Sequence, residues 1–200
     1  MKSTITAMIL LMVCQARCDK VCQPPQSESL FYLTGSNSDF FVANDFTQGL
    51  VLAASGTSGN GDRWVLADLK AGITYVGTPE GGCHYKFFPS EIMELYDQCL
   101  PGDAELVRSG FVDFYLMPRP GNTWFVGMKS LPDTDYSVRH FSRYSWDGTV
   151  DQSLTYGVLY EYSLGISDPT IFQKDLSVCV EGEVDEGGNF AKDFHANKGN

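Results

Sequence analysis

The sequence predicts an all-β protein of antiparallel strands, and three observations support this prediction. Residues 154–166 alternate, with an apolar residue at every second position and mostly small or polar residues between, which indicates one long, two-faced strand. Eight or nine short strand-like segments occur at close spacing, separated by turn-forming residues. Only one segment has a helical pattern. Together these features favour sheets that are packed face to face or curled into a partial barrel.

Length and composition indicate one domain. The chain has 200 residues, of which 43% are hydrophobic, enough to bury one core, and no repeat divides it. Residues 1–16 combine Lys2, a short apolar stretch and a small residue at Ala16, which predicts a cleaved secretory signal that is too short to span a bilayer. We therefore expect a β domain over residues 17–180 and an acidic, glycine-rich flexible tail over residues 181–200.

The first half of the expected domain is a series of short strands. Residues 23–26 form an extended lead-in, and residues 35–38 are turn formers. The glycine-rich stretch 55–62 predicts a hairpin with a long, flexible tip. No lysine or helix start follows that tip, which argues against a phosphate cradle. The strands are expected over residues 30–33, 40–43, 49–54, 63–69 and 73–76.

The second half begins with the helical candidate. Ser90 is placed to cap a helical turn over residues 91–96. Glu91, Glu94 and Asp97 share one face of that turn, and we interpret them as a solvated acidic face rather than a metal site. Strands are expected over 107–117, 123–129 and 137–146, before the long strand. At its end, Asp168 followed by proline is typical of a helix cap.

The charge balance limits the partners. The chain carries 14 basic and 25 acidic residues, a formal net charge of −11. Nucleic acid is disfavoured, because no basic stripe is available to displace counterions from phosphates. The acidity is explained either by solubility in an extracellular fluid or by binding of a divalent cation such as calcium, which prefers oxygen ligands. Charge alone does not choose between them.

The cysteines predict disulfides. Cys14 leaves with the signal, so an odd number remains, which suggests two disulfides and one further thiol in an oxidising compartment. Spacing does not fix the pairing. Each bridge that closes a long loop would stabilise the fold by roughly 4 kcal/mol on the chain-entropy model. The five remaining residues are Cys18, Cys22, Cys83, Cys99 and Cys179.

No motif indicates catalysis. The sequence contains no G-x-S-x-G elbow, no H-E-x-x-H and no P-loop. His84, His140 and His195 lack a metal-ligand spacing. His84 follows Cys83, but neighbouring residues of a strand point to opposite faces, which argues against a thiol and base pair. We therefore predict a protein that is not an enzyme and has no organic cofactor.

Aromatic residues on the expected strands are candidates for a ligand pocket. Taken singly, each is explained as sandwich core. Taken together they suggest more, because Phe111, Phe114 and Tyr115 fall on both faces of their strand, so one face lines a cavity or interface unless both are covered. A groove that buried a chain of about 16 carbons would gain on the order of 10 kcal/mol. The candidates are Phe111, Phe114, Tyr115, Trp124, Phe125, Tyr144, Trp146, Tyr156, Tyr160 and Tyr162.

Several short blocks occur in a characteristic order. The stretch L-G-I-S-D-P-T-I-F at residues 164–172, followed by Cys179, resembles the C-terminal signature of the ependymin-related proteins. The opening Cys22-Gln-Pro-Pro, the stretch 68–76 with Cys83, and Trp124 are similar to other parts of that family. Residues 99–104 resemble a stretch typical of its invertebrate members. The likeness covers residues 22–179.

This resemblance implies a fold and a ligand class. It implies two stacked antiparallel sheets in a half-open, LolA-like sandwich or partial barrel, with a hydrophobic pocket between the sheets and at most one or two short helices. It also implies calcium-modulated behaviour, a homodimer, and a role in binding hydrophobic ligands, in matrix adhesion or in signalling. Many relatives are N-glycosylated, whereas this chain has no N-x-S/T sequon, so we expect secretion to the extracellular space rather than glycan-based lysosomal sorting.

The resemblance also implies a disulfide pattern. Cys83 and Cys179 match the family's central and final cysteines and are expected to pair. Vertebrate relatives carry a cysteine partner for the first cysteine where this chain has the polar stretch 133–135. We therefore expect Cys22 to pair with Cys99, which leaves Cys18 as the odd thiol.

Three functions compete on this basis. The leading one is a secreted, non-enzymatic protein that binds a lipid or other hydrophobic ligand between its sheets. The alternative is a calcium-dependent matrix, adhesion or signalling protein without a small-molecule ligand. A hydrolase ranks last, because it would need a polar constellation deep in the cavity.

Overall fold

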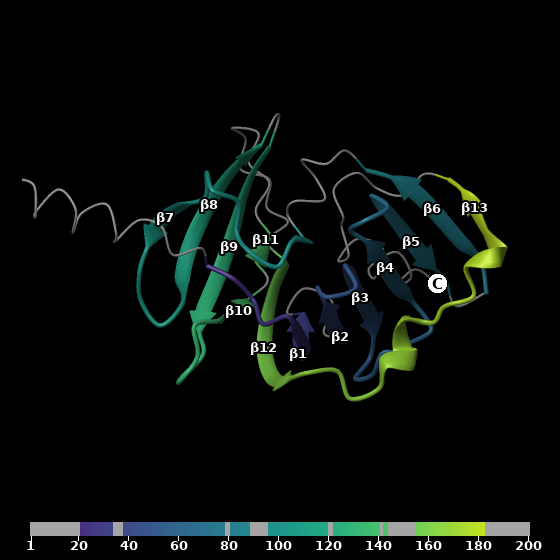
Figure 1. Ribbon diagram of the computed structural model, residues 1–200, viewed down its shortest axis with the longest axis horizontal. Coiled ribbons are helices and arrows are strands. Elements are labelled where there is room, and N and C mark those ends of the chain that lie inside the picture. Colours follow the sequence, from purple (N-terminus) through teal and green to yellow (C-terminus); the bar gives the residue numbers. More distant parts are fainter. Residues whose placement is uncertain are drawn as a thin grey trace, which may run out of the picture.

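The computed structural model describes residues 21–33, 38–78, 81–88, 96–119, 122–140, 142–143 and 155–182. These residues form an all-β fold with two sheets (Figure 1), which confirms the predicted fold class. The expected signal, the helical turn with Glu91 and Glu94, and most of the expected tail lie outside the described residues. None of the described helices is long and apolar enough to cross a membrane.

Thirteen strands and two short 3-10 helices make up the described structure. Of the strand that the sequence predicted over 137–146, the structure describes two pieces, Ser137–His140 and Ser142–Arg143, and the rest lies outside the described residues. The elements are β1 (Gln26–Leu33), β2 (Ser38–Asp45), β3 (Leu50–Ser55), β4 (Trp64–Asp68), β5 (Ile73–Gly77), β6 (Cys83–Phe87), β7 (Glu105–Arg108), β8 (Asp113–Arg119), β9 (Asn122–Ser130), β10 (Ser137–His140), β11 (Ser142–Arg143), β12 (Thr155–Leu164), η2 (Pro169–Phe172), η3 (Leu176–Val178) and β13 (Cys179–Glu181).

The larger sheet is a meander to which the C-terminal third of the chain adds strands at both edges. Its strand order is β11-β12-β1-β2-β3-β4-β5-β6-β13. β1 to β6 are joined to one another as consecutive antiparallel neighbours. The predicted long strand is β12, which pairs with β1 from Ser27 opposite Leu164 to Leu33 opposite Gly157. β13 then pairs with β6, and this pair is parallel.

The two faces of the larger sheet pack against different partners. On one face, Phe41, Leu52 and Leu66 form a core with Ile171 and Phe172 of η2. We call it the C-terminal face, because residues 166–176 cover it. We call the opposite face the intersheet face, because the smaller sheet approaches it. It carries two core clusters, one built on the pair Phe31 and Phe40, the other on Val51 and Ala67 with Phe46, Leu69 and Phe88.

The smaller sheet has a core of its own. Its order is β10-β9-β8-β7. Its cluster contains Met117, Val126 and Met128 together with Leu100, and Val21, Tyr96, Ala104 and Tyr115 pack around it. Among the described residues, no core cluster contains strand residues of both sheets. Strands of the two sheets nevertheless contact each other, β9 with β11 and β10 with β12, and segments outside the strands join the sheets as well.

Backbone hydrogen bonds and a disulfide make that connection. Leu100 N–H donates to the Val21 carbonyl at 2.8 Å, and Ser137 N–H of β10 donates to the Cys22 carbonyl at 2.8 Å. Cys22 also forms a disulfide with Cys99. The start of the domain is thus held to both the 96–104 segment and the smaller sheet.

The second disulfide joins Cys83 to Cys179, and it holds β13 against β6, where these two residues lie opposite each other. These two disulfides are the cysteine pairs that the family resemblance led us to expect. They close separations of 77 and 96 residues, and each contributes about 4–5 kcal/mol on the chain-entropy model. Cys18 lies outside the described residues.

The glycine-rich tip between β3 and β4 contacts the C-terminal segment at one point, Gly59, while the residues on either side of Gly59 are exposed, and the expected flexibility of the tip stays a prediction. Gly59 is buried, and a Cβ there would come within 2.9 Å of the Ile171 side chain. A Cβ on Gly61 would lie 1.9 Å from the Ser55 carbonyl oxygen. The Lys174 ammonium donates to the Gly59 carbonyl at 2.8 Å. Gly59 therefore allows a close approach to the C-terminal segment, and Gly61 allows the tip to fold back on Ser55.

Asp45, at the end of β2, is a buried carboxylate with several donors. It accepts hydrogen bonds from Gln26 Nε2 at 2.9 Å, Thr47 Oγ1, Gln48 Nε2 at 2.6 Å and Gln48 N–H at 3.1 Å. Burial by itself raises the pKa of Asp45, but these hydrogen bonds together outweigh burial and hold the pKa below its ordinary value of 3.8. The charged form therefore stabilises the turn into β3.

We expect Asp45→Asn to lower the free energy of unfolding by about 2–4 kcal/mol at pH 7, because several donors lose a charged acceptor. Since the folded pKa is lowered, this stabilisation is present above the unfolded pKa of about 3.9 and is lost as pH falls through the folded value. Urea unfolding at pH 7 and near pH 3 measures it. The exposed Asp62→Asn is the control, and a deficit of Asp45→Asn that stays constant with pH would contradict this account.

Candidate functional site between the sheets

An apolar cavity of about 60 Å³ lies against the intersheet face. Its wall comes from β1, β2 and β3, and Tyr96 and Arg139 line it from the side of the smaller sheet. The wall residues with apolar side chains are Phe31, Phe40, Val42, Val51 and Ala53.

Strand register explains why these side chains share one face. Phe31 lies opposite Phe40 across β1 and β2, and Val42 lies opposite Ala53 across β2 and β3. Since directly paired residues of antiparallel strands project to the same face, the apolar positions form a continuous patch. The rings of Phe31 and Phe40 stack with centroids 5.0 Å apart and planes inclined by 16°, and Leu159 of β12 packs beside them.

Polar side chains on the same face mark one end of the patch. Asn44 Nδ2 donates to Ser27 Oγ at 3.2 Å, and both residues are buried. Tyr162 pairs with Ser29 and so projects to the same side. Burial raises the pKa of Tyr162, and the nearby Ser27 hydroxyl offsets part of that rise. The Tyr162 hydroxyl is itself buried and has no hydrogen bond of normal geometry within the described part of the chain.

Arg139 brings a positive charge to the cavity from β10. It pairs with Met128 of β9, so it lies on the face of the smaller sheet that carries that sheet's core. Its Nη2 donates to the Asp97 carbonyl at 3.4 Å. Burial lowers the pKa of Arg139 to about 10, although Tyr96 and Asp97 act to raise it. The guanidinium therefore stays charged at neutral pH. Burial raises the pKa of Asp97, against the effect of Arg139.

This arrangement suits an apolar molecule with an acidic end. A patch of aromatic and aliphatic side chains binds a hydrocarbon surface without regard to direction. A buried guanidinium forms charge-assisted hydrogen bonds with carboxylate or phosphate oxygens, which are stronger than those with a neutral carbonyl. Together they combine hydrophobic attraction with an anchor that fixes orientation.

The aromatic residues that the sequence suggested do not gather in this cavity. Phe111 precedes β8 and is 80% exposed, with the Lys129 ammonium 4.1 Å from its ring centroid. Tyr115 packs at the edge of the core of the smaller sheet, and Phe114, the next residue along β8, is half-buried. Tyr160 is 51% exposed. Of these ten candidates, Tyr162 alone projects to the intersheet face among those whose side chains are described.

The remaining aromatic candidates are not placed at side-chain level. Trp124 and Phe125 belong to β9 and Tyr156 belongs to β12, but only their backbones are described. Tyr144 and Trp146 lie outside the described residues. Their part in a pocket stays a prediction.

Metal ligands do not cluster in the described part of the chain. No group of three or more His, Cys, Asp or Glu side chains there is placed to hold a metal ion. Asp97, the described member of the acidic triplet, lies beside Arg139. Calcium binding, which the resemblance implies, stays a prediction.

Sequence reasoning missed the residues that do line the cavity. Ser27, Ser29 and Phe31 share one face of β1, and Phe40, Val42 and Asn44 share one face of β2. The signal was present as alternation with small polar residues, but it was weaker than the aromatic alternation of β12. Arg139 gave no signal, because a single arginine in a strand is ordinarily a surface residue.

We expect Phe31→Ala to cost about 3–5 kcal/mol of stability, because it removes a buried ring from the patch. Benzene should restore part of the loss, since an apolar cavity stays dry and accepts an apolar guest. Urea unfolding with and without benzene measures both effects. Phe87→Ala, at a residue 57% exposed, is the control. A cost no larger than that of the control, or no response to benzene, would contradict an apolar cavity.

A scan of protein-family models and a search of curated proteins both found no match to this chain. The resemblance to the ependymin-related proteins is therefore carried by the quoted residues and motifs alone, and membership of that family stays a prediction.

Proposed function

We propose that this chain is a secreted, non-enzymatic protein that binds a lipid or other hydrophobic ligand between its two sheets. The observation that carries the proposal is the apolar cavity on the intersheet face, with Arg139 in its lining. Secretion is supported by the leader-like first 16 residues and by two disulfides, since such bonds persist in oxidising compartments. The non-enzymatic part rests on the lack of a catalytic motif in the sequence.

The cavity between the sheets is smaller than a typical small-molecule site. Small-molecule sites commonly measure roughly 300–1,000 Å³, whereas the cavity measures about 60 Å³. A fatty chain would therefore require the sheets to move apart. Such a movement would leave the described core clusters of the two sheets intact, but it would have to change the contacts of β9 with β11 and of β10 with β12. The Cys22–Cys99 disulfide would keep the chain start joined to the 96–104 segment as the space widened.

The charge of Arg139 narrows the ligand to an acidic amphiphile. In the absence of ligand the guanidinium donates to the Asp97 carbonyl. A fatty-acid carboxylate or a lipid phosphate is a better acceptor than that carbonyl, because it is charged. The hydrocarbon would lie along Phe31, Phe40 and Val42, with its acidic end at Arg139.

Filling the cavity should weaken the binding of a fatty acid. Val42→Phe adds bulk at a half-buried position in the wall, and we expect at least a tenfold weaker affinity for a fluorescent long-chain fatty acid, measured by titration. The matched control is Val180→Phe in β13, at a residue 56% exposed. Circular dichroism checks folding, because overpacking costs about 1–3 kcal/mol. Equal affinities of the two variants would overturn the proposed site.

Removing the positive charge should distinguish ligands by their head group. We expect Arg139→Gln to weaken the affinity for a long-chain fatty acid by about tenfold or more, which is the effect of one charge-assisted hydrogen bond. The affinity for the corresponding long-chain alcohol should stay within about twofold of that of the parent protein. Competition against the fluorescent probe measures both. An equal loss for acid and alcohol would show that Arg139 maintains the structure and does not contact the ligand.

Adhesion without a small-molecule ligand is the competing function. It would be favoured by protein from the native source that carries no extractable lipid and does not bind the fluorescent fatty acid. Sedimentation with calcium and then with a chelator would show a change of size in that case. A calcium-dependent change of size would also be the first evidence for a dimer or for matrix partners.

A further inference from the structure

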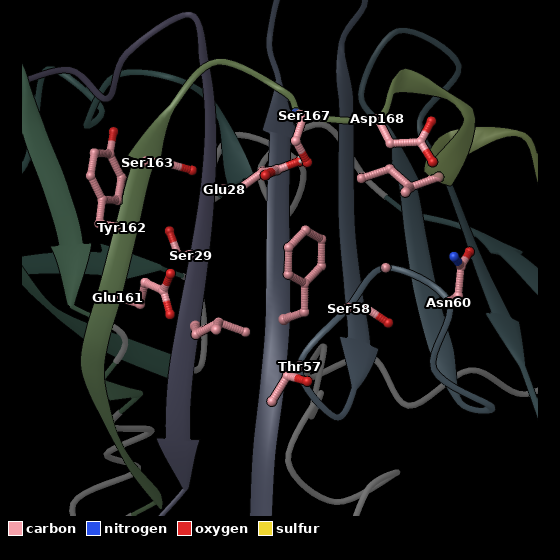
Figure 2. Close-up of a pocket in the computed structure, with 14 residues that line it drawn as sticks. Glu28, Ser29, Thr57, Ser58, Asn60, Glu161, Tyr162, Ser163, Ser167 and Asp168 are labelled. Carbon is pink, nitrogen blue, oxygen red and sulfur yellow. Dashed lines mark hydrogen bonds between the residues drawn. The ribbon is translucent and has the colours of Figure 1, made fainter.

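A second and larger pocket lies on the opposite face of the same strands. It measures about 310 Å³, at the lower end of the range for small-molecule sites. Its walls come from three parts of the chain: β12 with β1 and β2, the tip between β3 and β4, and the segment that follows β12 (Figure 2). Ser29 lines this pocket as well as the cavity between the sheets, and Tyr162 also lines this pocket. The other wall residues of the two sites differ, and those of the intersheet cavity on β1, β2 and β3 project to the opposite face.

Strand register builds the base of this pocket. Leu30 of β1 lies opposite Phe41 on one side and Glu161 on the other, while Glu28 lies opposite Ser163. These five side chains therefore project to the same face of the sheet. Leu30 and Phe41, with Ile171 above them, give an apolar floor that belongs to the core of the C-terminal face.

Polar groups surround that floor. Figure 2 shows Glu161 and Ser163 on one side of the pocket and Asp168 and Asn60 on the other. The glutamates and the aspartate can only accept hydrogen bonds when ionised, whereas serine hydroxyls and the asparagine amide both donate and accept. Among the described residues that line the pocket there is no lysine or arginine, which disfavours phosphate, sulfate and other anions.

The walls are held in place before any ligand arrives. Glu28 Oε1 accepts hydrogen bonds from both Ser167 N–H and Ser167 Oγ at 2.9 Å. Asp168 Oδ1 accepts from Thr170 N–H at 2.9 Å and from Thr170 Oγ1 at 2.6 Å. Lys174 holds the tip through the Gly59 carbonyl. Such preorganisation lowers the ordering cost of binding.

We infer that this pocket binds a small neutral carbohydrate, a mono- or disaccharide. A sugar has an apolar C–H face that matches the floor and a rim of hydroxyls that donate to carboxylates and exchange hydrogen bonds with serine and asparagine. An ammonium ligand only donates, and so would leave the donors of the pocket unmatched. Its attraction to the exposed carboxylates Glu161 and Asp168 would also be weak, because exposed ion pairs contribute only about 0–1 kcal/mol.

The test uses the full mature chain and saturation-transfer difference NMR. The probes are the methyl glycosides of glucose, galactose and N-acetylglucosamine, with maltose, at millimolar concentration. We expect at least one probe to show saturable binding that does not change with added sodium chloride, because the ligand is neutral. Ser163→Trp should abolish it by filling the pocket. The matched control, Ser130→Trp, is at an exposed residue of β9 and should bind as the parent does.

A milder pair of variants tests the hydrogen bonds without added bulk. Glu161→Gln should lower the affinity for the sugar by about tenfold. Glu105→Gln, at an exposed residue of β7, should leave the affinity for the sugar unchanged. The inference is overturned if no probe binds, if Ser163→Trp folds and still binds sugar, or if both glutamate variants behave alike. Salt-sensitive binding of spermidine without sugar binding would overturn it in favour of a cation site.

This inference and the proposed function fail separately. Ser163→Trp should retain the affinity of the parent for the fluorescent fatty acid, and Val42→Phe should retain sugar binding, because the two side chains lie on opposite faces of the sheet.

Discussion

The pairing of β12 with β1 is the constraint on which the rest of the structure depends. It joins residues more than 120 positions apart, from Ser27 with Leu164 to Leu33 with Gly157. Closing so long a loop is costly in chain entropy. This entropic cost is offset by the many hydrogen bonds of the long β1–β12 pair. It is also offset by the contacts that the next segment of the chain can then make with the sheet. Once β12 lies beside β1, the chain turns at Gly165, where φ is +82°, and crosses the sheet as residues 166–176.

That crossing completes the larger sheet. Ile171 and Phe172 cover the core built on Phe41, Leu52 and Leu66, and Cys179 reaches Cys83 at the far edge. The glycine-rich tip then meets Ile171 where only a glycine fits. Without the crossing, this apolar face would be exposed to water. The same segment therefore provides burial, a disulfide partner and one wall of the pocket on the C-terminal face.

Opposite faces of the same strands carry different side-chain chemistry. In β1, Ser29 and Phe31 project to the intersheet face, while Glu28 and Leu30 project to the C-terminal face. The period of two residues in a strand makes this separation unavoidable. One face combines stacked phenylalanines with a buried guanidinium, and the other combines an apolar floor with carboxylates and hydroxyls. A protein that bound an amphiphile on one face and a sugar on the other would present two independent surfaces for recognition.

The sequence by itself determined the class of structure and several local features. Alternation over 154–166 predicted β12, and turn formers marked most of the other strands, because both signals are local. Asp168 before proline predicted a cap, and its side chain does cap η2 through Thr170 N–H. The resemblance also led to the cysteine pairs that the structure contains. Only the tertiary structure decided what covers each face, because alternation shows that two faces differ but not what packs on them. The exposed Phe111 differs from its sequence expectation for that reason, and the place of Arg139 in the cavity lining could not be predicted from the sequence. The contact of Gly59 with Ile171 could not be predicted from the sequence for the same reason, since Ile171 lies more than 100 residues away in the chain.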